Sequence, residues 1–506
     1  MFENIIEGTV LVLTWEALLW IIIGYSLGSL LGAIPGLTGI VGIALLLPLS
    51  FYLPPWVAIP MLIAVGKGSS FGSSIPAILI NTPGTPAAAA TCIDGYELTK
   101  QGKSGKALKA SLYAGLIGDV FSDLVLIFAA VALARVALSF GPAEYTSLMF
   151  FALTVVGAVA ATAVLKGIMG ATLGIFLSMI GTDMITGVPR MTFGILELSD
   201  GISMIPLMIG LLAMSEIILQ AEKIIYEKRF NAGPRTAEIR LSSSSDHSLA
   251  REDLPGFFRG TVIGSIIGTG IGILPGLGQS VAAFVGYGEA KRFSRHPEKF
   301  GKGAVEGVAA PEAAGNAVNG ANMVPLLALG IPGDVIAAIL LGALMVHGLT
   351  PGPLLFEQHG VTIVAIYAGM MITNFVHWPI GLLFIRISRL ITLIKFEHLM
   401  PFVLVFCIGG TYAINNSLFD VYVLVITGVV GAVLRKRGFA PVTIVIGFIL
   451  GPLLENSFRQ TLLISQGNYL VFFERPVSLG IILVALGSVT FTFFMERRRR
   501  TNSRIS

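Results

Sequence analysis

The sequence predicts an all-α polytopic membrane protein made of two inverted-topology repeats, in which Gly/Pro-broken helices and hairpins meet at a central site. Three observations support this prediction: the composition, a series of long apolar stretches, and a repeated pair of glycine- and proline-rich motifs. Of the 506 residues, 54% are hydrophobic and 12% are charged, so the chain holds more apolar surface than one soluble core could bury. The 60 glycines and 25 prolines are typical of membrane helices that pack closely or break around a cavity.

Membrane-spanning helices are predicted wherever an apolar stretch approaches the roughly 20 residues that cross a bilayer. Two regions, 17–95 and 260–350, are instead punctuated by glycine and proline, and simple helix counting fails in them. We expect the chemistry of the protein in these two regions. The continuous apolar stretches are 107–138, 145–165, 167–185 and 203–220, followed by 361–385, 399–415, 418–434, 440–455 and 477–496.

Lysine and arginine residues gather in short loops between the apolar stretches, and such loops lie on the cytoplasmic side of a membrane. An even number of crossings separates each cluster from the next, so all of them can be cytoplasmic at once. The sequence therefore predicts a cytoplasmic C-terminus. The basic clusters are 100–109, 291–302, 386–389, 435–437 and 497–500.

Two motifs of the first half of the chain recur in the second half. A shift of 240 positions places Gly24–Leu37 on Gly264–Leu277. A shift of 249 positions places IPAILINTPG, Ile75–Gly84, on VPLLALGIPG, Val324–Gly333. The glycines of the first motif fall four apart, a spacing that lets helix backbones approach closely, and we expect them to serve packing.

The charges of equivalent loops indicate that the two repeats are inverted. The basic loop 291–302 corresponds to the uncharged segment 51–62, so equivalent loops are expected on opposite faces of the membrane. Two inverted halves can expose a site between them first to one side and then to the other. The predicted domains are a first repeat at 1–221, a cytoplasmic linker at 222–259, a second repeat at 260–476, and an additional C-terminal transmembrane helix with a basic cytoplasmic tail at 477–506.

The TPG and IPG sequences that end the second motif predict breaks in two helices. Proline removes an amide donor and restrains the residue before it, while Gly84 and Gly333 are expected to take the positive φ of a sharp turn. A half-helix that begins after such a turn offers free amides and a positive dipole end to an anion. A single PG pair more often only kinks a packed helix, but two pairs at matching positions favour a site. The candidate substrate-binding residues are Thr38, Ser74, Asn81, Thr82, Pro83, Gly84, Gln279, Asn319, Asn322, Ile331, Pro332 and Gly333.

Charged residues within apolar stretches are a second set of candidates, because charges are expensive in a membrane and mark ion pathways. Asp119 and Asp123 lie four apart on one helix face, Glu312 opens an asparagine-rich stretch, and Asp334 follows the second break. Their oxygens suit a transported cation, although the two neighbouring aspartates are also compatible with polar anchoring of adjacent helices. Lys67 is either a counter-charge for an anionic substrate or a side chain that reaches toward the membrane surface.

Other classes of protein agree less well with the sequence. An enzyme would need a nucleophile, a metal cluster or a phosphate cradle, but HExxH, Walker A and GxGxxG motifs are absent, and the GxSxG match at Gly68–Gly72 is treated as accidental. Cys92 and Cys407 are predicted to be inert buried thiols. No cofactor, nucleic-acid partner or metal site is expected beyond a transported sodium ion. A channel-like pore for organic anions stays the alternative, because broken helices also build selectivity filters.

A family resemblance is carried by five segments, LGAIPGLTG, SSIPAILINTPGTPAAAATCIDGYELTKQGKSGKAL, IGTDMITGVPRMTFGILELSDGI, TGIGILPGLGQ and APEAAGNAVNGANMVPLLALGIPGD. They lie within about residues 24 to 352 and resemble, in order, the motifs of the large membrane subunit of tripartite tricarboxylate transporters, the TctA family. Three positions depart from the family's pattern: Glu97 after DGY, Asp334 after IPG, and Lys67 before the first break.

The resemblance implies a cation-coupled secondary transporter of the bacterial inner membrane that imports tri- or dicarboxylate anions by alternating access. It also implies two partners, a small four-helix membrane subunit and a periplasmic solute-binding protein that delivers the substrate. The coupling ion, sodium or proton, and the identity of the carboxylate stay open. The segment 180–201 joins two spans on the face expected to be periplasmic, so Arg190 and Asp200 are expected to be available to the binding protein.

Overall fold

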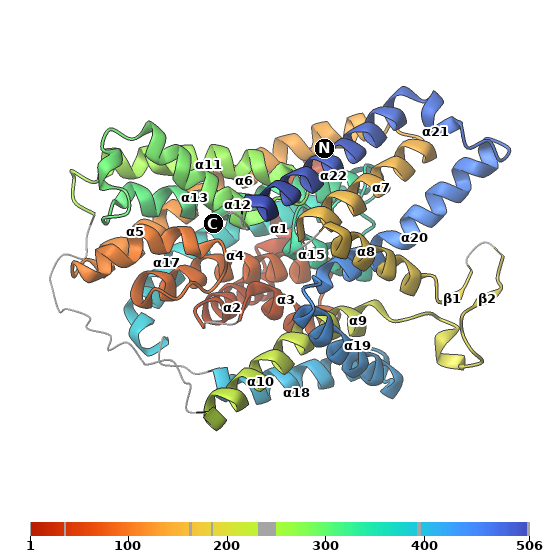
Figure 1. Ribbon diagram of the computed structural model, residues 1–506, viewed down its shortest axis with the longest axis horizontal. Helices are drawn as coiled ribbons and strands as arrows, with labels where there is room; N and C mark the ends of the chain where they lie inside the picture. Colours follow the sequence, from red (N-terminus) through yellow and green to blue (C-terminus); the bar gives the residue numbers. More distant parts are fainter. Residues whose placement is uncertain are drawn as a thin grey trace. The chain divides into compact units, whose positions relative to one another are not determined.

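The computed structural model shows a chain that is almost entirely helical wherever it is described (Figure 1). The sheet within those ranges is a two-stranded antiparallel hairpin, β1 (Gly181–Thr182) and β2 (Pro189–Arg190). The all-α prediction is therefore confirmed. The structure describes residues 2–34, 37–160, 164–183, 186–230, 249–391 and 396–502, so Pro35, Gly36 and residues 231–248 of the predicted linker, with its serine run at 242–245, lie outside the described residues.

Eight helices of the described chain are long and apolar enough to cross a membrane, judged by length and composition. They confirm the prediction of a polytopic membrane protein. The stretch 167–185 gives a shorter helix than predicted, because the helix ends at Ser178 and the chain turns into the β-hairpin. The eight helices are Trp15–Gly32, Pro55–Ile80, Ser104–Ala137, Met204–Tyr226, Leu254–Ile273, Gly360–Ser388, Leu418–Lys436 and Pro441–Ile464.

The chain forms two compact units, and each unit takes segments from both halves of the sequence. Unit 1 comprises Met1–Ala134 and Leu219–Phe406, and unit 2 comprises Arg135–Ile218 and Cys407–Ser506. The repeat boundaries predicted from the sequence cut across these units and stay a prediction. Three helices continue from one unit into the other: α6 (Ser104–Ala137), α10 (Ser215–Phe230) and α18 (Phe396–Asn415).

The remaining helices divide between the two units. Unit 1 contains α1 (Phe2–Val12), α2 (Trp15–Gly32), α3 (Gly39–Ser50), α4 (Pro55–Ile80), α5 (Ala88–Lys100), α11 (Leu254–Ile273), α12 (Gly278–Phe293), η3 (Pro297–Lys299), α13 (Val305–Ala321), α14 (Met323–Leu329), α15 (Val335–Val346), α16 (Leu354–Gln358) and α17 (Gly360–Ile391). Unit 2 contains α7 (Pro142–Ala160), α8 (Val164–Ser178), η1 (Leu196–Leu198), α9 (Met204–Ile209), the π-helical η2 (Gly210–Met214), α19 (Leu418–Lys436), α20 (Pro441–Ile464), α21 (Val471–Glu474) and α22 (Pro476–Asn502).

In unit 2, α20 packs against α7 and α8, α22 packs along α7, and α19 packs against α9 and η2. Glycines again allow the close contacts, since a Cβ on Gly447 would strike the carbonyl of Ala171. An ion pair of 2.7 Å between Arg435 and Glu216 joins α19 to α10. This unit carries the β-hairpin between α8 and α9.

Two helix pairs of the same kind lie at the centre of unit 1. α2 packs along α4, while α11 packs along α13 beside α12 (Figure 1). The four-residue glycine spacing makes these approaches possible. A Cβ on Gly24 would lie 2.5 Å from the carbonyl oxygen of Met61, and a Cβ on Gly264 would strike the carbonyl of Ala310. The packing role predicted for these glycines is confirmed.

Each half of the chain also contributes a long helix to the central pair of the other half. α17 packs on α4, where Gly369 lies against Pro60. In the equivalent place α6 meets α13, where a Cβ on Gly118 would strike the carbonyl of Ala313. The two halves therefore share one packing scheme, whereas their inversion across the membrane stays a prediction.

The central helices α4 and α13 are shielded from the surroundings. All 17 residues of α13 are buried, and α4 is buried from Val57 to Leu79 apart from Ser70. Polar side chains on such helices are tolerable only when they have partners, because an unpaired polar group is costly to bury. The polar residues of α4 and α13 therefore define the site.

Candidate functional site

Both predicted helix breaks have the same backbone geometry. Asn81 is the C-cap residue of α4 and Gly330 that of α14, and both lie in the left-handed region, with φ of 54° and 73°. In both breaks the next amide donates to the carbonyl of a proline inside the helix, Pro76 or Pro325, at 3.2 Å. These residues are equivalent under the shift of 249 positions, so the second sequence repeat is also a structural repeat.

The two PG glycines do not supply the turn, and the prediction that Gly84 and Gly333 take positive φ is wrong. They are required instead for close packing. A Cβ at Gly84 would lie 2.9 Å from the Cα of Ser73, and a Cβ at Gly333 would lie 2.5 Å from the Cβ of Asn322. Each would also crowd a backbone carbonyl of the glycine ladder on the neighbouring helix.

A small polar cavity lies between α4 and α13, next to the first break. Its volume is about 20 Å³, which is enough for one water molecule or ion and too little for a di- or tricarboxylate. Its walls come from α4, the first break, the start of α12, and α13. The polar groups on the walls are the hydroxyls of Ser70, Ser73, Ser74 and Thr85, the amides of Gln279 and Asn316, and the carboxylate of Glu312.

The carboxylate of Glu312 is held by hydroxyl groups of the other half of the chain. Ser74 donates to its two oxygens at 2.7 and 2.8 Å, and Thr91 donates to it as well. The side-chain nitrogen of Asn316 donates to the Glu312 carbonyl at 2.9 Å, and its buried Oδ1 has no hydrogen-bond partner among the described residues. The cavity therefore offers one carboxylate and several hydroxyl and amide oxygens, together with hydroxyl donors.

A row of hydrogen bonds leads from this cavity to a pair of buried aspartates. Gln279 donates to Ser70 at 3.2 Å and to Asn319 at 2.5 Å. Asn319 in turn donates to Asp119 at 3.3 Å. The structure thus brings together four of the predicted site residues, Ser74, Gln279, Asn319 and Glu312, around or beside one cavity.

Lys67 lies at the far end of this row and pairs with both aspartates. Its Nζ is 2.5 Å from Asp123 and 3.6 Å from Asp119, and it donates to Asn374 at 2.8 Å. The lysine is only 1% exposed, so the interpretation as a side chain reaching the membrane surface is wrong. The aspartates anchor α6 to α4 and α17 through this cation and Asn374.

The other predicted residues lie around the breaks in different environments. Thr38 precedes α3 and makes no side-chain capping bond. Residues 81–83 of the first break are exposed, whereas residues 331–333 of the second are buried. Asp334 accepts the amide of Ala337 at 2.8 Å and caps α15, so this half-helix does not present all its first-turn amides freely. Asn322 is buried at the junction of α13 and α14.

Several residues of this region were missed by the sequence reasoning. Ser70 and Ser73 line the cavity, and they are equivalent to Asn319 and Asn322 under the shift of 249 positions. Polar residues at equivalent positions of the two repeats were the signal that could have identified them. Thr91 lies on α5, shortly after the first break, whereas Asn374 and His377 meet the site from α17, far away in the sequence, and no local pattern marks them.

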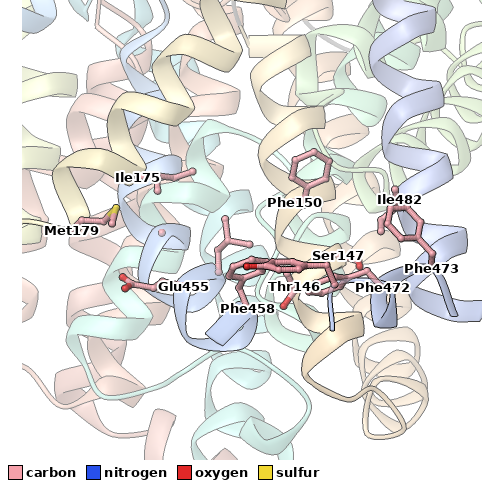
Figure 2. A pocket seen from close by; sticks show the side chains of 13 residues that line it. Thr146, Ser147, Phe150, Ile175, Met179, Glu455, Phe458, Phe472, Phe473 and Ile482 are labelled. Atoms are coloured by element: carbon pink, nitrogen blue, oxygen red, sulfur yellow. The ribbon is translucent and has the colours of Figure 1, made fainter. Parts of the chain in front are cut away.

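Unit 2 holds two larger cavities, and the lining of the first does not suit a carboxylate site. The first, of about 540 Å³, is lined by aromatic side chains that include Phe150, Phe458, Phe472 and Phe473 (Figure 2). Figure 2 shows Glu455 at its edge, but the lining is otherwise almost wholly apolar, and an anion there would be desolvated without partners. The second, of about 560 Å³, lies under the β-hairpin and is polar.

Arg190 on the hairpin has an internal role in unit 2. It binds Glu455 through two hydrogen bonds of 2.7 and 3.3 Å and lies 3.2 Å from Asp183. The hydrogen bond to Glu455 raises the pKa of Arg190 above its ordinary value. The expectation that Arg190 is free for a partner is therefore wrong, whereas Asp200 is exposed as expected.

Comparisons with known proteins point to one family. The profile of the tripartite tricarboxylate transporter TctA family matches residues 18–446. The "Uncharacterized 52.8 kDa protein in TAR-I ttuC' 3'region" of Agrobacterium vitis is 34% identical over 502 residues, which covers 99% of this chain and 98% of that protein. The "Uncharacterized protein in TAR-II ttuC' 3'region" of the same organism is 38% identical over 224 residues, 43% of this chain and 93% of that protein. No solved structure matches this chain significantly.

Proposed function

The chain belongs to the tripartite tricarboxylate transporter TctA family, and we propose that it imports di- or tricarboxylate anions into a bacterial cell by alternating access, together with cations. Membership makes it the large membrane subunit of a transporter and a multi-pass membrane protein. Two observations support the proposal: the pair of equivalent helix breaks, and the polar cavity beside the first of them.

The geometry of the cavity corresponds to a closed state of the cycle. At about 20 Å³ it cannot hold a carboxylate substrate, so the helices around it must separate to admit one. Hydroxyl groups such as those of Ser73 and Thr85 and the amides near the breaks are then the donors for the substrate carboxylates. Alternating access would open this cavity toward one side of the membrane and then toward the other.

Glu312 provides a physical reason for coupling to a cation. An anionic substrate that enters the cavity meets the carboxylate of Glu312, and two like charges at close range repel each other strongly in a buried site. A sodium ion or a proton relieves this repulsion, so substrate and cation bind more tightly together than separately. The membrane potential adds a second reason, because moving one negative charge into the cell against 100 mV costs roughly 2.3 kcal/mol.

The β-hairpin region is the segment we propose for docking of the solute-binding protein. Phe193 and Leu196 are 83% and 82% exposed on it, outside the helices that are long enough to cross a membrane. Exposed apolar side chains next to an exposed charge, here Asp200, are typical of a protein-binding surface. We further propose the inner membrane as the location, with the basic tail in the cytoplasm and a small four-helix subunit as the membrane partner.

Uptake measurements test the proposed function. Cells that express the chain with its small subunit are expected to take up at least one member of a panel of labelled di- and tricarboxylates. The uptake should saturate, require the cognate binding protein, and stop when sodium and proton gradients are collapsed together. Non-saturable flux that persists without any gradient would instead identify the channel-like pore that is the alternative function.

The same uptake assay tests the segment proposed for docking of the binding protein. Replacing Phe193 and Leu196 with serine should reduce binding-protein-dependent uptake with no loss of protein from the membrane, because both side chains contact little of their own chain. The matched control is Phe293→Ser, since Phe293 is 61% exposed beside the basic loop expected to face the cytoplasm. Equal uptake by the hairpin variant and the wild type would exclude this surface.

A further inference from the structure

A buried histidine on α17 has no assigned role in the site described above. The side chain of His377 is fully buried, and neither ring nitrogen has a hydrogen-bond partner among the described residues. Its Nδ1 lies 3.5 Å from Oδ2 of Asp119, an oxygen that also has no hydrogen-bond partner there. The rings of Tyr25 and Phe71 lie close, with centroids 5.1 and 5.6 Å from that of the histidine. A neutral imidazole therefore leaves its polar atoms unpaired in a buried place, which is costly.

The charges around this histidine do not balance while its ring is neutral. With Lys67 charged and both Asp119 and Asp123 ionised, the buried cluster has a net charge of one minus two, or −1. A proton on His377 brings the net charge to zero and gives Asp119 an N–H donor. In the described chain, the titratable groups facing the histidine from other helices are these three and Tyr25.

We propose that His377 is the proton-binding residue of the transport cycle, so that a proton gradient drives uptake by this chain. The inference rests on the function proposed above and names its coupling ion. Neutral His377 takes a proton from water on the outer side, holds it as an imidazolium beside Asp119, and returns it to water on the inner side. One N–H bond is formed and later broken, and one proton crosses at this cluster in each cycle.

The hydrogen-bonded row described above connects this proton site to the substrate cavity. Asp119 accepts from Asn319, Asn319 accepts from Gln279, and Gln279 donates to Ser70 on the cavity wall. A change of charge beside Asp119 therefore alters groups that line the cavity through two intervening amides. Coupling between the two sites requires a physical connection of this kind.

Transport by the purified assembly tests the inference. The full chain and its small subunit are reconstituted in sodium-free liposomes, with the binding protein and the labelled carboxylate panel outside. We expect an acidic exterior to drive accumulation by the wild type, and His377→Gln to lower that accumulation by about tenfold or more. Exchange of labelled for unlabelled substrate at equal pH should keep a measurable rate in this variant, because exchange does not require the proton to leave.

His347→Gln is the matched control and should accumulate substrate as the wild type does, since His347 ends α15 beside Ser50 and away from the cluster. If His377→Gln does not fold, His377→Lys takes its place, because it puts a permanent positive charge beside Asp119. This variant should also lose accumulation and keep exchange.

Three results would overturn the inference in distinguishable ways. Accumulation driven only by a sodium gradient, or unchanged in His377→Gln, would exclude a proton site at His377 but leave carboxylate transport intact. If a folded His377→Gln variant lost both exchange and accumulation, the histidine would be structural. Absence of movement of every carboxylate under every gradient in the wild type would refute the proposed function as well.

Discussion

Lys67→Met is expected to leave little folded protein in the membrane. The ammonium group of Lys67 is the positive charge between Asp119 and Asp123, and all three side chains are at most 2% exposed. Removing one partner of a buried ion pair leaves an uncompensated charge and costs about 3–5 kcal/mol, which is a large part of the stability of a typical protein. Here two carboxylates would face each other without a cation.

The measurement is the amount of monodisperse protein after detergent extraction, together with its thermal unfolding temperature. The double variant Lys67→Met with Asp123→Asn restores the net charge of the wild-type cluster and should recover much of the protein, although not its transport. A Lys67→Met variant with the yield and unfolding temperature of the wild type would show that the ion pair does not stabilise the fold.

Lys67 also shows where prediction from the sequence ended. The apolar stretches and basic loops predict an all-α membrane protein because each spans a local window of the chain, and the structure confirms that class. The partners of Lys67 lie 56 and 307 positions away, at Asp123 and Asn374. No local pattern relates such positions, so the lysine could only be interpreted from its immediate neighbours, and the interpretation as a surface-reaching side chain was wrong.

The helix breaks are expected to tolerate an exchange of their turn residues but not a β-branched residue. Asn81→Gly and Gly330→Asn should transport as the wild type does, because glycine and asparagine both adopt the left-handed conformation seen at these positions. Asn81→Val and Gly330→Val should lose most transport activity, since the left-handed conformation costs an L-residue roughly 1–2 kcal/mol and β-branching adds to this.

The PG glycines should be sensitive for a different reason. Gly84→Val and Gly333→Val introduce side chains where even a Cβ would lie within 3 Å of Ser73 or Asn322, so transport should be blocked. The measurement is initial uptake rate normalised to the amount of protein in the membrane. If both valine variants, at normal protein levels, transported substrate with the wild-type rate and apparent affinity, the breaks would have no role in transport.

The candidate site was predictable in outline because it repeats. Matching prolines and glycines in two segments located both breaks, and the structure gives them the same hydrogen bonds. The residue that takes the left-handed turn could not be deduced, because it lies three positions before the PG glycine in each break. Nor could the cap formed by Asp334 be foreseen, since capping depends on where α15 begins.

The proposed opening of the cavity beside the first break, alternately toward the two sides of the membrane, can be tested by labelling a cysteine placed at Thr85. Thr85 lines the cavity and donates to Ser73 at 3.1 Å. The variant is made with Cys92 and Cys407 replaced by alanine and is treated with a small impermeant thiol reagent in right-side-out and in inside-out vesicles. We expect labelling from both sides, with substrate protecting the cysteine in each case. Labelling from one side only, whatever the substrate and gradient, would contradict the proposed opening.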